Sequence, residues 1–180
     1  RPQEAAAAVK YPHVEHDAEL SDEEFRLLRD FVHERFGLYF DESQRGSLRS
    51  RLAPRLALLG LISFEDYYRH LRFAPERAEE QQRMVSHLTN NETYFFREQP
   101  QLDVFSGPVL RAVKERKSRG GEKRLHILSA GCSTGEEPLT LGMILFDSGQ
   151  FFWGWDVRVT GLDVDAAALD KARRGVYHQN

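Results

Sequence analysis

The sequence predicts a small all-α N-terminal domain, at residues 19–88, followed by the first part of an α/β doubly wound domain. The helical prediction follows from apolar residues that recur at helical spacing through the first half of the chain. The α/β prediction follows from a strand, a loop of small residues, a helix and a second strand that succeed one another after residue 124. Residues 1–18 show no apolar periodicity, so we expect a flexible leader there.

The composition narrows the class of protein and its compartment. The 180 residues are 41% hydrophobic and 29% charged, as in an ordinary globular protein. A formal net charge of -3 argues against nucleic acid as a partner. Cys132 is the only cysteine, which excludes an internal disulfide and fits a reducing compartment. No apolar run approaches the ~20 residues that span a bilayer. We expect a cytoplasmic protein, monomeric and not inserted in a membrane.

The first two helices of the N-terminal domain carry clear end signals. Ser21 is followed three residues later by Glu24, which is the pattern of a capping box, and Gly37 supplies a stop. The second helix covers about residues 43–59. Pro54 lies inside its apolar pattern and removes one helical hydrogen bond, so we expect a kink or a break there.

Two more helices complete the N-terminal domain, and a further helical segment follows it. Ser63 begins the third helix, and the fourth runs from Pro75, a good first-turn residue, towards Leu88. Short connections between four helices indicate a small helical domain. The next helical segment covers residues 102–117, and we expect an interruption near Gly107-Pro108.

The α/β part of the chain has five predicted segments. They are a strand at 125–130, a loop of small residues at 131–135, a helix at 136–146, a second strand at 157–162 and a final helix that reaches Arg174. Asp163 ends the second strand, and Asp165 caps the final helix. Because two parallel strands cannot make a covered sheet, the sequence predicts a truncated domain.

The loop after the first strand fits a nicotinamide-dinucleotide site poorly. That fingerprint requires glycines at its first, third and sixth positions, and this loop has small residues at the first, third and fifth. Glu136 and Glu137 also fall in the first helical turn, where they would repel a pyrophosphate. This interpretation is therefore weak.

The same loop matches a hydrolase nucleophile elbow by its letters. Residues 131–135 read G-C-S-T-G, which would make Ser133 a nucleophile. An elbow normally follows several strands of its sheet, and we find none before Leu125. The elbow also needs a histidine after it, and His178 is the one available. The context of the motif argues against this interpretation.

An S-adenosylmethionine pocket accounts for the acidic residues at these positions. This ligand carries no phosphate, and its sulfonium and amino groups are positive. Glu136 can complement the charge of the amino-acid end, and Asp163 can accept hydrogen bonds from both ribose hydroxyls, as an acid does at the same place in dinucleotide folds.

Three motifs, in this order, resemble the CheR-type methyltransferases, the glutamate O-methyltransferases of chemotaxis receptors. They are N-E-T-Y-F-F-R at 91–97, S-A-G-C-S-T-G-E-E-P at 129–138 and G-L-D-V-D at 161–165. The resemblance covers about residues 19–180. It implies a class I, Rossmann-like methyltransferase domain, of which residues 99–180 would be the N-terminal part. Residues 89–98 would be an interdomain segment with cofactor contacts.

The resemblance assigns the cofactor contacts residue by residue. S-adenosylmethionine would be the cofactor and S-adenosylhomocysteine its product. The implied contacts are Asn91, Thr93, Arg97, Ala130, Glu136 and Asp163. Arg97 would also serve catalysis by orienting a carboxylate, since a guanidinium pairs with carboxylates bidentately. Leu139-Thr140 stands where the family often has an aromatic–serine pair.

The resemblance implies methylation of glutamate carboxylates on methyl-accepting chemotaxis receptors. The carboxylate would attack the sulfonium methyl group in line, and it needs no strong general base because it is already ionised. Catalysis would come from alignment and from the removal of water. The alternative is a non-catalytic module that docks receptors or binds S-adenosylmethionine for regulation. No metal is expected, since the histidines show no metal-ligand spacing.

Arginines of the second predicted helix are candidates for substrate docking: Arg45, Arg49, Arg51 and Arg55. The resemblance implies that this helix faces the acidic methylation helices of receptors. A charged helix face is more often only solvated, and exposed ion pairs contribute little individually. Both interpretations stay open at this point.

Overall fold

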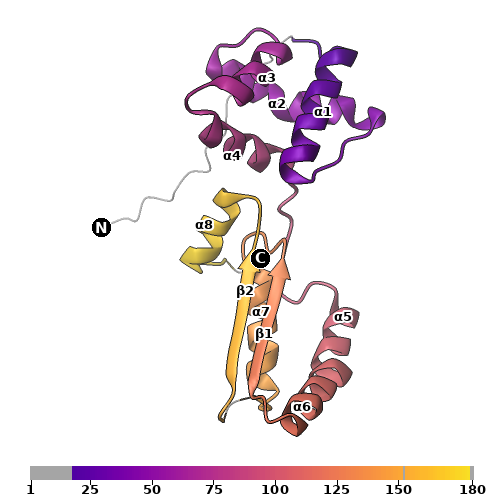
Figure 1. Ribbon diagram of the computed structural model, residues 1–180, viewed down its shortest axis with the longest axis vertical. Helices are drawn as coiled ribbons and strands as arrows, with labels where there is room; N and C mark the ends of the chain where they lie inside the picture. The colour runs from indigo at the N-terminus through magenta and orange to yellow at the C-terminus, as the bar shows by residue number, and fades with distance from the viewer. Residues whose placement is uncertain (1–17, 152, 179–180) are drawn as a thin grey trace, which may run out of the picture. The chain divides into compact units, whose positions relative to one another are not determined.

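The computed structural model describes residues 18–151 and 153–178 (Figure 1). The chain forms two compact units that divide between Leu88 and Thr89. The predicted leader lies outside the described residues except for Ala18. Within the part of the chain that the structure describes, no helix is long and apolar enough to cross a membrane.

The first unit is helical, as predicted. Its helices are α1 (Asp22–Phe36), α2 (Arg45–Leu59), α3 (Phe64–Phe73) and α4 (Arg77–Leu88), with a 3-10 turn (Glu42–Gln44) before α2. The capping box of α1 is confirmed, because Glu24 N–H donates to Ser21 Oγ while the Glu24 carboxylate accepts from Ser21 N–H. Gly37 ends α1 with a left-handed φ of 72°. Ser63 caps α3.

Pro54 does not interrupt α2, so of the kink or break expected there, the break is wrong. The helix continues from Arg45 to Leu59 with Pro54 inside it. Leu48, Leu52 and Leu56 are fully buried in the core of the unit and lie on both sides of the proline. Their burial, at about 1.5–3 kcal/mol for each side chain, exceeds the ~3 kcal/mol cost of one interior proline.

The first helical segment of the second unit contains a π-helical turn. It consists of α5 (Gln99–Val104), the π-helical turn (Phe105–Val109) and α6 (Leu110–Arg119). Pro108 lies inside the π-helical turn, so the interruption expected near Gly107-Pro108 is confirmed. An insertion of this kind keeps the chain helical while it accommodates a residue that lacks its N–H.

Two parallel strands and two helices follow, in the predicted order. They are β1 (Arg124–Ala130), α7 (Glu136–Asp147), β2 (Asp156–Leu162) and α8 (Ala166–Arg174). Figure 1 shows α7 running along one face of the strands. Leu110, Leu125, Leu145 and Phe151 form the core between the helices and the strands. This strand–helix–strand unit confirms the predicted α/β class.

The register of the sheet places the ends of β1 and β2 side by side. The strands pair in parallel, with Ser129 opposite Gly161 and Ala130 opposite Leu162. The loop after β1 and the acid after β2 therefore emerge at the same edge. In parallel α/β sheets this carboxyl edge is where ligands bind.

Candidate functional site

The loop after β1 is fixed against the end of β2. The N–H groups of Gly131 and Cys132 both donate to the Leu162 carbonyl, at 2.8 and 2.9 Å. Gly135 has a φ of 99°, and a Cβ at this position would lie 2.8 Å from the Tyr177 hydroxyl. Glycine is required there both for the backbone conformation and for the space.

Backbone strain is concentrated in the two segments that the sequence singles out. Among the described residues, the non-glycine residues with positive φ are Phe96 (57°), Glu98 (60°) and Ser133 (48°). Two of them flank Arg97, and the third lies in the loop after β1. Such conformations cost about 1–3 kcal/mol each and persist where contacts over-determine them, which is typical of functional sites.

Asp163 links the loop after β1 to the start of α8. Its Oδ2 accepts from Ser133 N–H at 2.7 Å, and its Oδ1 accepts from Asp165 N–H at 2.8 Å. The carboxylate is therefore held in one orientation at the end of β2. Each of its oxygens has a second lone pair, so it can still accept from the two hydroxyls of a ribose. The position fits the predicted role.

Asn91 makes two contacts inside the same unit. Its side-chain Nδ2 donates to Asp165 Oδ2 at 2.6 Å, and its backbone carbonyl accepts from Ser133 Oγ at 3.0 Å. Asn91 thus lies beside the loop and beside Asp163, as a cofactor contact would require. Its amide is directed at Asp165, a partner that the sequence did not predict.

Arg97 lies at the surface of the second unit. One guanidinium N–H donates to the Glu92 carbonyl at 2.7 Å, and the guanidinium carbon is 5.7 Å from the Tyr94 ring centroid. Its side chain is 46% exposed, with Glu98 at 4.0 Å. An exposed guanidinium with several donors can orient a carboxylate. Thr93 is half-buried in the same segment.

The remaining predicted cofactor residues lie at the carboxyl edge of the sheet. Ala130 is exposed at the end of β1. Glu136 is half-buried in the first turn of α7, and its carboxylate accepts from Thr134 Oγ1 at 2.6 Å. An acidic side chain at a helix N-terminus is favoured by the helix dipole.

The Thr140 hydroxyl anchors the segment around Phe96 to α7. Its Oγ1 accepts from Phe96 N–H at 3.2 Å and donates to the Glu136 carbonyl at 2.7 Å. The neighbouring Phe95 packs edge-on against Tyr177, with ring centroids 5.0 Å apart. The Leu139-Thr140 departure from the usual pair therefore keeps a hydroxyl that joins the segment to α7.

The loop does not carry an arranged nucleophile. Ser133 is 7% exposed, and its hydroxyl donates to the Asn91 carbonyl instead of to a histidine. Cys132 is buried, and burial, with the nearby Asp163 carboxylate, raises the pKa of its thiol above the usual range. A raised pKa leaves less thiolate at neutral pH. The elbow interpretation is disfavoured.

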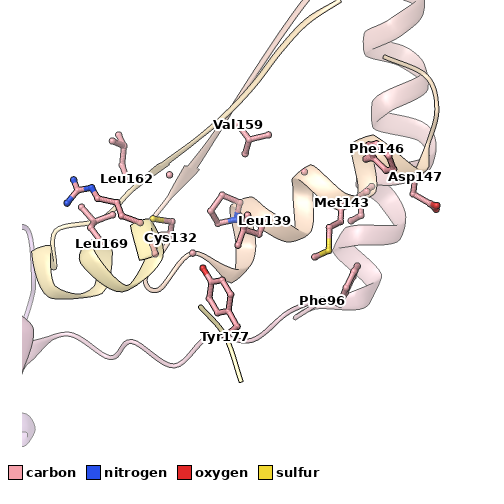
Figure 2. Close-up of a pocket in the computed structure, with 17 residues that line it drawn as sticks. Phe96, Cys132, Leu139, Met143, Phe146, Asp147, Val159, Leu162, Leu169 and Tyr177 are labelled. Atoms are coloured by element: carbon pink, nitrogen blue, oxygen red, sulfur yellow. The ribbon is translucent and has the colours of Figure 1, made fainter. Parts of the chain in front are cut away.

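An apolar groove lies beside the site, between α7, α8 and β2 (Figure 2). It has a volume of about 1020 Å³. Side chains that line it include Leu139, Met143, Phe146, Leu162, Leu169 and Tyr177. The six predicted cofactor residues, all of them described, are absent from its lining. Phe96, Cys132 and Gly135, which belong to the segments that carry those six residues, do line it, so the groove adjoins the predicted cofactor site.

Arg55 is not available for docking, which corrects the prediction for this residue. Its guanidinium is buried and donates to both carboxylate oxygens of Glu80, at 2.9 and 2.5 Å. The Tyr67 hydroxyl donates to the same carboxylate at 2.8 Å. The pair joins α2 to α4 inside the helical unit. The predicted flank of the helix is thus partly an interior face.

The other three docking candidates are partly buried and have partners in their own unit. Arg45 forms an ion pair with Asp22, Arg49 donates to the Ala18 carbonyl at 2.8 Å, and Arg51 donates to the Leu88 carbonyl at 2.7 Å. The side chains of Arg45 and Arg49 remain 32% and 36% exposed. Arg51 is half-buried like the other two, so all three remain candidates for docking.

Comparisons with known proteins match both units. The family model described as CheR methyltransferase, all-alpha domain, matches residues 23–89, and the model described as CheR methyltransferase, SAM binding domain, matches residues 91–180. The chain is 34% identical to chemotaxis protein methyltransferase 2 of Vibrio cholerae, over 88% of this chain and 54% of that protein. It is 36% identical to chemotaxis protein methyltransferase 2 of Pseudomonas aeruginosa, over 86% and 52%. It is 35% identical to the chemotaxis protein methyltransferase of Escherichia coli, over 88% and 51%.

These matches establish the family and support the cofactor. The chain spans about half the length of the curated relatives it matches. The description of the second family model supports S-adenosylmethionine as the cofactor. The matches of the two models, one after the other, repeat the order of a helical unit and an α/β unit. The chain therefore belongs to the CheR methyltransferase family.

Proposed function

We propose that the complete protein uses S-adenosylmethionine to methylate glutamate carboxylates of chemotaxis receptors. Membership of the family and the names of the relatives support methyl transfer in chemotaxis. The observation that carries the proposal is the Asp163 carboxylate, which is fixed at the end of β2 by the loop after β1. The single cysteine fits a reducing compartment, so we place the reaction in the cytoplasm.

The chemistry of the donor set suits this cofactor. The loop at 131–135 has small residues, so a ligand can approach its backbone closely. Asp163 would accept from the ribose hydroxyls, and Glu136 would face the amino group at the other end. Two carboxylates at one edge favour a cationic ligand without phosphate over a dinucleotide, because like charges repel.

The residues of the chain act by binding and orientation. When bound, S-adenosylmethionine supplies a methyl group on a cationic sulfur and leaves as S-adenosylhomocysteine once a glutamate oxygen has taken that group. Arg97 would orient a carboxylate with its exposed guanidinium. A glutamate of pKa ≈ 4.3 is ionised at neutral pH, so no side chain has to remove a proton. Alignment is the main contribution of the protein.

Receptor docking by α2 is the part of the proposal that involves the first unit. Arg45 and Arg49 would steer an acidic receptor helix towards the enzyme. Partly exposed arginines act mainly on the rate of association, because their attraction reaches beyond direct contact. Arg51, which is also half-buried and donates to the Leu88 carbonyl, would add to this attraction.

Replacement of Asp163 tests the cofactor site. In the full-length protein, we expect Asp163→Ala to weaken binding of S-adenosylhomocysteine at least about tenfold. The reason is the loss of two charge-assisted hydrogen bonds, each contributing about 1.5–3 kcal/mol. The measurement is titration calorimetry, accompanied by thermal unfolding, since Asp163 also holds Ser133 and Asp165.

A control variant checks that the effect of Asp163→Ala is specific, and a methyl-transfer assay separates an enzyme from a regulatory module. Asp170→Ala removes an exposed carboxylate of α8 that pairs with Arg173, and it should leave the affinity unchanged. Equal affinities in wild type and a folded Asp163→Ala variant would contradict the site. A wild-type protein that binds the product, yet transfers no methyl group from labelled S-adenosylmethionine to a receptor fragment, would favour the regulatory module.

A further inference from the structure

Hydrogen bonds join four residues of the second unit in a closed circuit. Asn91 Nδ2 donates to Asp165 Oδ2 at 2.6 Å, and Asp165 N–H donates to Asp163 Oδ1 at 2.8 Å. Ser133 N–H donates to Asp163 Oδ2 at 2.7 Å, and Ser133 Oγ donates to the Asn91 carbonyl at 3.0 Å. The circuit links three segments that are remote in sequence: the strand-end acid with α8, the loop after β1 and the segment before Arg97.

The two side-chain oxygens of Asp165 accept hydrogen bonds from different parts of the chain. Oδ1 caps α8 by accepting from the N–H groups of Ala167 and Ala168, at 2.9 and 3.3 Å. Oδ2 accepts from Asn91 Nδ2 and, at 3.4 Å, from Thr89 Oγ1. The residue is only 2% exposed, and a buried carboxylate is tolerated when donors satisfy it. An N-cap needs one acceptor oxygen, so the cap alone does not explain the second oxygen.

The far end of the same segment is also anchored. Phe96 N–H donates to Thr140 Oγ1 of α7, and the left-handed φ values of Phe96 and Glu98 fix the backbone on both sides of Arg97. Residues 91–97 are therefore tied to α8 and the loop at one end and to α7 at the other. Arg97 emerges from a strap that is held at two points.

We infer that Asp165 is a positioning residue, which holds the strap of residues 91–97 and the Asp163 carboxylate in one arrangement. Its second oxygen orients Asn91, and its own N–H orients Asp163. The inference rests on the proposed function, in which the strap and Asp163 contact one cofactor. Preorganisation of this kind reduces the ordering that a ligand must otherwise bring about on binding.

Exchanging the donor and the acceptor of the Asn91–Asp165 hydrogen bond separates the positioning role of Asp165 from its role as the cap of α8. In the full-length protein, Asp165→Asn keeps an Oδ1 acceptor for α8 but turns an NH2 donor towards the amide of Asn91. The double variant Asn91→Asp, Asp165→Asn reverses the two partners and restores one donor and one acceptor. Asp170→Asn, at an exposed position of α8, is the matched control.

The readouts are affinity for S-adenosylhomocysteine and hydrogen exchange of residues 91–97 in the protein without ligand. We expect Asp165→Asn to weaken binding about tenfold and to speed exchange of the strap about tenfold, as one lost hydrogen bond of ~1.4 kcal/mol predicts. The double variant should recover the exchange rate of the strap to within about threefold, and the thermal unfolding temperature of the protein should change little throughout. Affinity is compared among wild type, Asp165→Asn and Asp170→Asn, because Asn91 is itself a predicted cofactor contact.

The outcomes distinguish this inference from the proposed function. If wild type fails to bind the product, the proposed function fails, but exchange of the strap still decides the role of Asp165. Unchanged exchange in Asp165→Asn would overturn the inference. Faster exchange that the double variant does not slow again would also overturn it, because the Asn91–Asp165 hydrogen bond would then not be what holds the strap.

Discussion

At the scale of single residues, the conformation of Ser133 is maintained by its hydrogen bonds. Its left-handed φ of 48° costs about 1–3 kcal/mol. Its N–H donates to the Asp163 carboxylate, a charge-assisted bond of about 1.5–3 kcal/mol, and its hydroxyl donates to Asn91. The two bonds offset the strain, so the loop can present its backbone at the carboxyl edge without a glycine at this position.

Cys132 is a packing residue and not a nucleophile. A Cβ added at Gly161 would lie 2.8 Å from the Cys132 sulfur, which shows how closely the thiol fits against β2. Burial and the Asp163 carboxylate raise the pKa of this thiol. Only the thiolate reacts with alkylating reagents. At any given pH, the folded protein therefore has less thiolate than an unfolded chain.

We therefore expect slow alkylation of Cys132 in the native protein. Between pH 7 and pH 9, iodoacetamide should react at least about tenfold more slowly with the folded protein than with the same protein in urea, because burial restricts access and favours the neutral thiol. The rate should keep rising with pH through the usual thiol range of ≈ 8–9, where the rate of an ordinary thiol levels off. Mass spectrometry of quenched samples measures it. Equal rates in both states would contradict the assignment of a buried, inert thiol.

At the scale of elements, α2 combines a proline with a buried ion pair. The apolar residues around Pro54 keep the helix continuous, as described above. Arg55, the next residue, pairs with Glu80 of α4, and Tyr67 of α3 donates to the same carboxylate. Three helices thus meet at one carboxylate. Removal of one partner leaves the other charge buried without compensation, which is more costly than the pair is stabilising.

Loss of Arg55 should therefore destabilise the helical unit. We expect Arg55→Ala to lower the free energy of unfolding by about 3–5 kcal/mol, the range for a broken buried pair. Arg45→Ala should cost much less, because the Asp22 carboxylate that it pairs with is exposed. Urea unfolding of the full-length protein, monitored through the first unit, compares the two variants. Similar losses from both would show that Arg55 and Glu80 do not form the interior contact.

At the scale of the whole molecule, patterns among residues close in sequence predicted the helices and strands. Contacts between residues remote in sequence could not be predicted. The cap at Ser21 and the stop at Gly37 depend on neighbours within a few residues, so the sequence displays them. The Asn91–Asp165 bond joins residues 74 apart, and no spacing in the chain indicates it. Asp165 was predicted as a cap, and that much is confirmed. Its second partner, Asn91, can be identified only in the folded structure.

The same difference of scale explains the outcome for the docking arginines. Periodicity placed Arg55 on a charged flank, but Glu80 lies 25 residues away and turns that flank inwards. Helical spacing gives the direction of a side chain around one helix, and packing against a second helix decides whether that direction is exposed. The positions of Ala130 and Asp163 were predicted better, because they lie at strand ends, whose place in a parallel sheet follows from topology. Their contacts with a cofactor stay a prediction.

The docking proposal makes a prediction that involves both units. If Arg45 and Arg49 steer an acidic receptor helix, the double reversal Arg45→Glu, Arg49→Glu should slow receptor methylation several-fold at low ionic strength. The difference from wild type should shrink as salt rises, since exposed charges are screened over a Debye length of about 8–10 Å. Affinity for S-adenosylhomocysteine should stay unchanged, because these arginines belong to the other unit. The measurement is methylation rate against ionic strength.

A matched control decides whether position or only charge matters. Arg69→Glu, Arg72→Glu changes the net charge equally and in the same unit, but on the exposed side of α3. We expect it to reproduce the wild-type rate and salt slope closely, because a local patch, and not the total charge, would guide the receptor helix. If both reversals slow methylation equally, attraction is a property of the whole unit. If neither does, Arg45 and Arg49 serve only their contacts with Asp22 and Ala18, and α2 does not dock the receptor.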